Sequence, residues 1–184
     1  MPRSAGPKPR LSTIRPPSPP TERLEKREFK RLQQSLVERW LALHEIESVP
    51  RDVVVVPSLS LDGFQLGNIP GITHYEERML FTLGLLRHPR ARLVYVTSQP
   101  LHPAILDYYL ALIGGIPTAH ARERLTLVSC YDTSPRALTE KVLERPRLVQ
   151  RIRDAIEQSR AHMTVFTVSD MERSLAVRLG IPLY

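Results

Sequence analysis

Four times along this chain, an apolar run is followed by a polar break and then by a helix-like pattern. The clearest run is Val53-Val54-Val55-Val56, and similar runs occupy residues 93–96, 125–128 and 163–168. Unbroken β-branched and aliphatic runs are typical of strands that are covered on both faces. Strands joined by helices are typical of parallel pairing. The sequence therefore predicts an α/β fold of three layers, Rossmann-like, with a parallel sheet of about four strands.

The stretch from Leu93 to Asp107 shows this unit most completely. Its apolar run breaks at Thr97-Ser98-Gln99-Pro100, and a helical pattern then continues to Ile113. A second helix is predicted from about His74 to Arg87, with Thr73 as N-cap and Glu76 three residues later, the spacing of a capping box. A strand, a turn and a crossover helix thus recur as one building block.

Further helices are predicted after the third and fourth runs. The helical region after residue 135 is interrupted near Pro146, because proline cannot continue a helix from its interior. The last helix begins at Ser169, with Glu172 completing a capping box, and ends at Gly180. The closing segment, residues 181–184, is typical of the approach to another strand. We therefore expect this chain to be the N-terminal part of a longer protein, or one half of a two-chain system.

Three segments divide the chain. Residues 1–20 carry seven prolines, and such a composition predicts a disordered tail because little apolar surface can be buried. Residues 21–48 are expected to form an amphipathic helix capped by Thr21. Its apolar stripe, spaced by three and four residues, predicts packing on the sheet or on a partner; it consists of Phe29, Leu32, Leu36, Trp40 and Leu43. Residues 53–184 make the α/β domain.

The charge and the cysteine count limit the classes of function. The 26 basic and 19 acidic residues give a net charge of +7, but basic and acidic side chains are interleaved rather than gathered into a nucleic-acid footprint. No apolar stretch approaches the roughly 20 residues of a membrane span. Cys130 is the only cysteine, which excludes an intrachain disulfide and favours a cytoplasmic location. We expect neither a nucleic-acid partner nor a membrane.

The usual motifs of catalysis are absent from the sequence. It contains no G-x-G-x-x-G after a strand, no phosphate-binding P-loop and no G-x-S-x-G nucleophile elbow. Its six histidines show no zinc-ligand spacing on one helix face. Cys130, directly after a strand, is interpreted as a structural thiol. The residues themselves identify no catalytic group, no cofactor-binding group and no metal ligand.

What the sequence does offer is a set of polar residues where strands end and helices begin. In open α/β sheets ligands bind beyond the carboxyl ends of the strands, so these residues could together line a small-molecule crevice. Each one is also a routine cap or turn residue, and only their convergence would matter. The candidate substrate-binding residues are Ser58, Ser60, Asp62, Tyr75, Glu76, Thr97, Ser98, Gln99 and Asp132.

Four long phrases carry a family resemblance. They read VVVVPSLSLD, GITHYEERMLFTLGLLRHPRARLVYVTSQPLHPAILDYYL, HARERLTLVSCYDTSPRALTEKVLERPRL and VRLGIPLY. Together they resemble the pre-ATP-grasp region of ATP-grasp carboxylate–amine ligases related to the pheganomycin-type peptide ligases. The resemblance covers about Val53 to Tyr184, and it implies a three-layer pre-ATP-grasp domain.

The resemblance also implies a partner and cofactors. In this family an ATP-grasp module follows, binds ATP and Mg²⁺, and joins a carboxylate to an amine through an acyl-phosphate. The residues that hold ATP and the metal belong to that module, so none is carried onto this chain, which is expected to be inactive alone. The expected partners are an ATP-grasp domain, in cis or in trans, and a small carboxylate or amine substrate.

Two alternatives remain open from the sequence. The chain could be a free-standing interaction or regulatory module that docks a separate ligase subunit. It could also be a small hydrolase or transferase that acts at the strand ends, in which case Asp62, Ser98 and Asp132 would carry the activity.

Overall fold

A computed structural model describes residues 22–45 and 49–184 of the chain. The predicted tail of residues 1–20, the Thr21 cap and the side chain of Trp40 lie outside the described part. The helices and strands follow one another in this order: α1 (Glu22–Glu45), β1 (Arg51–Val56), α2 (Gly63–Gly67), η1 (Ile72–His74), α3 (Tyr75–Arg78), η2 (Met79–Arg87), β2 (Ala91–Thr97), α4 (Pro103–Ala111), α5 (Thr118–Glu123), β3 (Leu125–Ser129), α6 (Leu138–Leu143), α7 (Pro146–Asp154), η3 (Gln158–Arg160), β4 (Ala161–Val165) and α8 (Asp170–Leu179).

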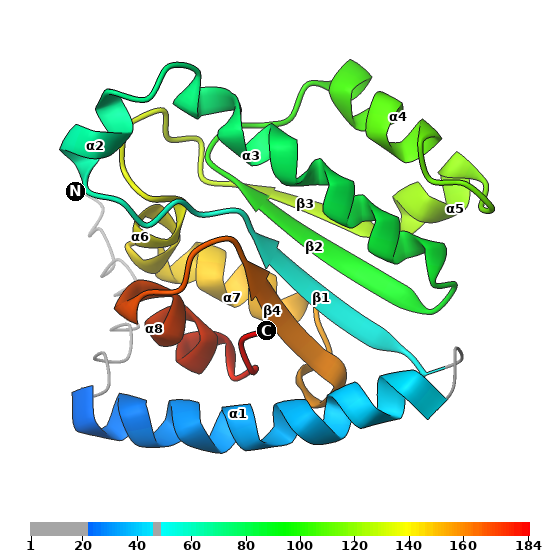
Figure 1. Ribbon diagram of the computed structural model, residues 1–184, viewed down its shortest axis with the longest axis horizontal. Coiled ribbons are helices and arrows are strands. Elements are labelled where there is room, and N and C mark those ends of the chain that lie inside the picture. The colour runs from blue at the N-terminus through cyan, green and yellow to red at the C-terminus, as the bar shows by residue number, and fades with distance from the viewer. Residues whose placement is uncertain (1–21, 46–48) are drawn as a thin grey trace, which may run out of the picture.

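The four strands form one sheet in the order β3-β2-β1-β4, and every pairing is parallel. Val54 of the central strand β1 lies opposite Val94 on one side and Met163 on the other. The sheet crosses the molecule between two layers of helices, with η2, α4 and α5 on one face and α6, α7 and α8 on the other (Figure 1). The predicted parallel α/β fold is confirmed.

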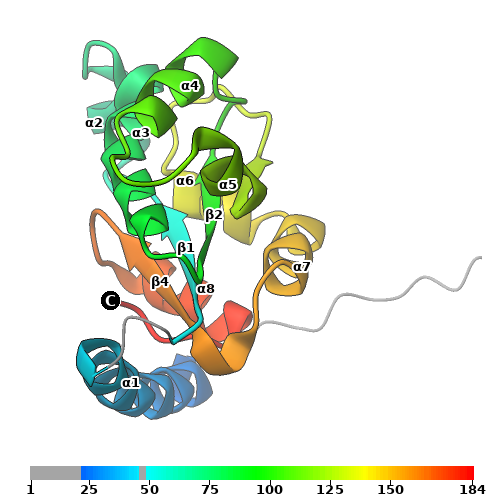
Figure 2. The same ribbon diagram turned by 90° about the vertical axis from the view of Figure 1, so that its right-hand side faces the viewer.

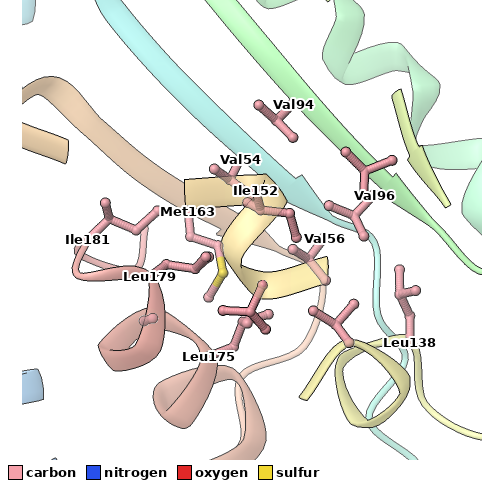
Figure 3. Packing of buried hydrophobic residues seen from close by; sticks show 14 of the residues in the cluster. Val54, Val56, Val94, Val96, Leu138, Ile152, Met163, Leu175, Leu179 and Ile181 are labelled. Carbon is pink, nitrogen blue, oxygen red and sulfur yellow. The ribbon is translucent and has the colours of Figure 1, made fainter. Parts of the chain in front are cut away.

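Alternation along the strands supplies two separate cores. Val54, Val56, Val94 and Val96 point to the face covered by α6, α7 and α8, where they meet Met163 and the leucines of α8 (Figure 3). Val53, Val55, Leu93 and Tyr95 point to the other face and meet η2 and α4. Burial on both faces explains why β1 and β2 read as continuous apolar runs.

The helix predicted from His74 to Arg87 takes a different form. The single turn α3 is followed by nine residues of 3-10 helix, η2, with Leu80, Leu83 and Leu86 all buried. A 3-10 helix has three residues per turn, so leucines spaced by three residues share one face. The tighter winding therefore places all three leucines on the face that packs against β2.

Several predicted boundaries are confirmed and others move. Pro146 begins α7 after a break, and Ser169 with Glu172 forms the capping box of α8, which ends at Gly180 in the left-handed conformation. The fourth strand begins two residues earlier than predicted, at Ala161, and ends at Val165, leaving Phe166 exposed. The helix α5 was not predicted.

The edge of the sheet beside β4 is covered by the two ends of the described chain. Leu183 pairs in parallel with Met163, with backbone hydrogen bonds of 2.8 Å from Met163 N to Pro182 O and 2.7 Å from Tyr184 N to Met163 O. The side chain of Gln33 on α1 bonds to both the N–H and the C=O of Leu183. The closing segment thus makes one isolated parallel bridge beside β4, whereas the further strand stays a prediction. The helix α1 lies beside this segment and along α8 (Figure 2).

Candidate functional site

A cleft lies where the chain leaves β2 and β3 in opposite directions. The segment after β2 continues into α4 on one face of the sheet, whereas the segment after β3 continues into α6 on the other. Neighbouring strands whose exits diverge open a crevice at their carboxyl ends. The arrowheads of β1, β2 and β4 point toward this end of the molecule, where α2 and α6 lie (Figure 1).

The cleft has a volume of about 240 Å³ and is built from five segments. The loop after β1 covers it from one side and packs closely on the loop after β3, since a side chain at Gly63 would lie 3.2 Å from the carbonyl oxygen of Pro135. Its apolar lining includes Leu59, Leu66, Ile72 and Leu138. Its polar lining includes Glu76, Ser98, Gln99, Asp132, Arg136 and Lys141.

Glu76 on α3 places a largely buried carboxylate in this cleft. Its Oε1 accepts a hydrogen bond of 2.6 Å from the Ser98 hydroxyl, and its Oε2 accepts one of 2.5 Å from the Ser98 backbone N–H. The hydroxyl of the buried Tyr95 donates to the backbone carbonyl of Glu76 at 2.5 Å, which fixes α3 on the sheet. Burial raises the pKa of Glu76 above its usual value, opposed by the hydrogen bonds from Ser98.

This geometry contradicts the capping-box interpretation of Glu76. The residue that caps α3 is His74, which makes no side-chain capping bond. The carboxylate of Glu76 turns instead toward the end of β2. Ser98, which comes directly after that strand, supplies both of its donors, so residue 76 belongs to the cleft rather than to the helix start.

Lys141 on α6 brings a buried ammonium group to the same network. Its side chain is 3% exposed, and its Nζ donates to the Ser98 hydroxyl at 2.9 Å and to the backbone carbonyl of Asp132 at 3.0 Å. The hydroxyl of Ser98 thus accepts from Lys141 and donates to Glu76. Buried lysine is rare unless its charge is compensated, and here the compensation passes through one hydroxyl group.

Asp132 is the centre of the loop after β3. Its Oδ1 accepts from the backbone N–H and the hydroxyl of Ser134, at 2.9 and 2.6 Å, and its Oδ2 accepts from Arg145 at 2.7 Å and from Arg136 at 3.3 Å. The bonds from Ser134, followed by that from Arg145, hold the pKa of Asp132 well below its usual value. This carboxylate is fully engaged in holding its own loop.

Two further features shape the end of β3. The carboxamide oxygen of Gln99 accepts from the backbone N–H groups of Asp132 and Thr133, at 2.9 and 3.2 Å, in the amide orientation that satisfies both groups. Tyr131 has φ of 54°, a left-handed conformation that a non-glycine residue adopts only when its surroundings require it. The loops after β2 and β3 are therefore held together by side-chain and backbone bonds at the cleft.

Ser58 and Ser60 belong to a separate, closed network that joins the end of β1 to α6 and α8. The fully buried hydroxyl of Ser58 accepts from the backbone N–H of Thr139 at 3.2 Å. The hydroxyl of Ser60 donates to Glu172 at 2.5 Å, and Glu172 also accepts from the N–H and the hydroxyl of Ser169. Neither serine lines the cleft.

Asp62 and Thr97 also have structural roles. The carboxylate of Asp62 caps α2 by accepting from the N–H of Gln65 at 2.8 Å. Thr97 is 4% exposed, and its backbone carbonyl accepts from Cys130 N–H at 2.9 Å within the sheet. The hydrolase hypothesis grouped Asp62 and Asp132 with Ser98, whereas the Ser98 hydroxyl bonds to Glu76 and Lys141.

Five of the nine candidate residues therefore meet in one cleft, and four do not. The residues that meet are Tyr75, Glu76, Ser98, Gln99 and Asp132. Tyr75 stands at the rim, where its ring makes an edge-to-face contact with Phe166 at 5.3 Å between centroids. The sequence interpretation missed Lys141 and Arg136. A signal for Lys141 existed, because it lies three residues after Leu138 and next to Val142 on a helix whose apolar residues are buried.

The cleft does not suit ATP with its metal ion. In residues 22–45 and 49–184, no group of three or more His, Cys, Asp or Glu side chains is arranged to hold a metal. The cleft is smaller than the roughly 300–1,000 Å³ typical of sites for drug-sized ligands. The carboxylate of Asp132 is already neutralised by two arginines.

The environment of Cys130 does not favour a reactive thiol. Cys130 is buried, and burial raises the pKa of its thiol to about 11, the opposite of an activated nucleophile. The structural interpretation of Cys130 agrees with this environment.

In the described part of the chain, none of the helices combines the length and the apolar character that a membrane crossing would need.

Comparison with known proteins identifies one informative relative. The chain is 36% identical over 119 residues to an L-propargylglycine–L-glutamate ligase of Streptantibioticus cattleyicolor. The match covers 62% of this chain and 25% of the relative, so the chain spans only about a quarter of that enzyme's length. No family model and no solved structure matches the chain. The predicted relation to ligases is confirmed by this match.

Proposed function

We propose that this chain, which is related to carboxylate–amine ligases of the pheganomycin type, is the domain of such an enzyme that frames the substrate. The observation that carries the proposal is the 36% identity to an L-propargylglycine–L-glutamate ligase, a protein that joins two amino acids. The parallel α/β fold with a polar cleft at the carboxyl ends of its strands supports it.

In this proposal an ATP-grasp module supplies ATP, Mg²⁺ and the chemical step. In the cleft Asp132 is paired with Arg136 and Arg145, and Glu76 and Lys141 are joined through the Ser98 hydroxyl. No group of His, Cys, Asp or Glu side chains in the described residues is arranged around a metal. This chain would then bind and orient the carboxylate or amine substrate, and the module would form the acyl-phosphate. We place the assembly in the cytoplasm, where ATP is available and where the reducing conditions suit a protein whose single cysteine is a buried free thiol.

Exposed apolar side chains around the cleft support the docking of such a module. Phe64 follows β1, Tyr131 follows β3, and Phe166 and Val168 follow β4, so the carboxyl end of the sheet carries them all. Large apolar side chains gathered on one side of a domain often mark a contact surface. The same surface would serve a module in cis or, in the alternative function, a separate ligase subunit in trans.

A domain exchange tests the proposal. The matched 119-residue stretch of the relative is replaced by the corresponding stretch of this chain, and ligation of L-propargylglycine to L-glutamate is measured by mass spectrometry. We expect the chimaera to hydrolyse ATP and to form a dipeptide, whereas the relative lacking that stretch should not.

The isolated chain provides the matched control. Mixed with MgATP, L-glutamate and apolar amino acids, it should release no ADP. ADP release by the purified chain would contradict the proposal, because the chemistry would then lie on this chain. Ligation restored by mixing the chain with the truncated relative, rather than by fusing them, would favour the two-subunit alternative.

A further inference from the structure

Glu76 and Lys141 stand out because they line one cleft with opposite charges and are not in direct contact. Lys141 is buried and Glu76 is partly buried. Among the ion pairs of the described residues, each within 4.0 Å, none joins these two side chains, and the hydroxyl of Ser98 bridges them instead. In a direct ion pair each charge would be neutralised by the other, and neither would be available to a ligand. The intervening hydroxyl keeps an anionic and a cationic group apart on one wall of the cleft.

Both groups retain hydrogen-bonding capacity. An ammonium group has three donors, and Lys141 uses two of them on Ser98 and Asp132 in the described part of the chain. An ionised carboxylate has about four acceptor sites, and among the described residues Glu76 receives two hydrogen bonds, both from Ser98. Each group can therefore take one more charged partner without losing the bonds that hold it.

The remaining charges of the cleft are already balanced. The carboxylate of Asp132 is held by Ser134, Arg136 and Arg145, and Arg136 also bonds to Glu144 at 2.7 Å. The charged residues that line the cleft are two acids and two bases, so the lining carries no net charge. A ligand without net charge fits such a lining better than an anion or a cation, which would leave one buried charge uncompensated.

We propose that the cleft binds one amino acid as its zwitterion, with the carboxylate on Lys141 and the ammonium group on Glu76. The apolar lining around Leu66, Ile72 and Leu138 would receive an aliphatic side chain. The volume of about 240 Å³ suits a ligand smaller than a nucleotide or a peptide. This inference rests on the proposed function in that the amino acid would be the one that the ligase joins.

Blocked amino acids test the two contacts without altering the protein. Binding of L-alanine, L-valine and L-leucine to the purified chain is measured by calorimetry, alongside N-acetyl-L-leucine, which lacks the ammonium group, and L-leucinamide, which lacks the carboxylate. We expect saturable binding of at least one free amino acid. Both blocked forms of leucine should bind about tenfold more weakly or worse, since each loses a charged hydrogen bond.

Substitutions then assign each charge to its residue. In Lys141→Met the advantage of L-leucine over L-leucinamide should disappear, and in Glu76→Gln the advantage of L-leucine over N-acetyl-L-leucine should disappear. Lys30→Met, at an exposed position on α1, is the matched control and should bind as the parent does. Circular dichroism verifies that each variant is folded.

The outcomes separate this inference from the proposed function. Equal binding of L-leucine and N-acetyl-L-leucine to the parent chain, or no saturable binding of any free amino acid up to its solubility, would overturn the zwitterion site. Amino-acid binding by the chain, together with a chimaera that does not ligate, would leave the site standing and overturn the ligase proposal. If the chimaera ligates but the chain binds no amino acid, the ligase proposal stands and the zwitterion site is overturned.

Discussion

The carboxylates of Glu172 and Glu76 both accept hydrogen bonds from serine, but the two networks serve different purposes. Glu172 is fully buried and accepts from the hydroxyls of Ser60 and Ser169 and from the N–H of Ser169. Within the described part of the chain Glu76 accepts only from Ser98, and it lines a cleft that also contains Lys141. One network is closed on itself, whereas the other is open on one side.

The number of acceptor sites already used within the fold distinguishes a structural carboxylate from one that can bind a ligand. Glu172 completes the capping box of α8 and ties that helix to the loop after β1, so its acceptors are used within the fold. Glu76 retains acceptor sites and faces a cation across one hydroxyl. A carboxylate that keeps free acceptor sites at the wall of a cleft can still accept hydrogen bonds from a ligand.

Removing Glu172 should give the largest effect. We expect Glu172→Ala to lower the free energy of unfolding by about 3 kcal/mol, because it leaves buried donors unpaired and removes a helix cap. Urea unfolding followed by circular dichroism measures the change. Glu123→Ala, at an exposed position on α5, is the control and should change stability by less than about 0.5 kcal/mol. Equal losses in the two variants would contradict the structural role of Glu172.

The interaction between Glu76 and Lys141 through Ser98 should appear as non-additive losses of stability in a double-mutant cycle. Glu76→Gln leaves the ammonium group of Lys141 without its anion, and Lys141→Met leaves the carboxylate of Glu76 without its cation. We expect each single variant to lose about 1–3 kcal/mol of stability and the double variant to lose less than their sum by about 1 kcal/mol. Chemical unfolding of the four proteins gives the cycle. Additive losses would mean that Ser98 does not transmit the interaction.

The comparison also explains what could be predicted from the sequence. The strands β1 and β2 were visible in the sequence because both of their faces are buried, so that each is a continuous apolar run such as Val53 to Val56. The 3-10 winding of η2 was not predicted, although the buried leucines recur every three residues. The tighter turn depends on how this segment packs on β2, and the sequence does not contain that contact explicitly.

The candidate site was recovered only in part for a related reason. Residues after a strand end can point to either side, and a local pattern does not decide which. Ser58 and Ser60 were therefore grouped with Ser98, although Ser58 bonds to α6 and Ser60 to α8. Lys141 was missed because it follows β3 by more than ten residues and reads as an ordinary helical lysine. Its ammonium group is held by Ser98 and Asp132, and the bond to Ser98 joins segments that are far apart in the chain.

Asp62 tests whether a polar residue near the cleft matters by position alone. Its carboxylate caps the short helix α2 and does not line the cleft. We expect Asp62→Ala to lower the free energy of unfolding by about 1 kcal/mol or less, as the loss of an N-cap does. Calorimetry should show unchanged binding of free amino acids. Weaker binding in this variant would mean that the site extends along the loop after β1.

The pH dependence should give the smallest effect, and its sign is fixed by Glu76. Because burial raises the pKa of Glu76 above its usual 4.5, the folded protein binds this proton more tightly than the unfolded chain does. The stability that this proton contributes is fully present below pH 4.5 and is lost as the pH rises through the raised pKa. Glu76→Gln has no such group, so its stability relative to the parent should increase as the pH rises through that window. Urea unfolding of both proteins across the acidic range measures the difference, with Glu123→Gln as the control. A relative stability that falls over this window would show that the hydrogen bonds from Ser98 outweigh desolvation, and the carboxylate would then be as well satisfied as that of Glu172.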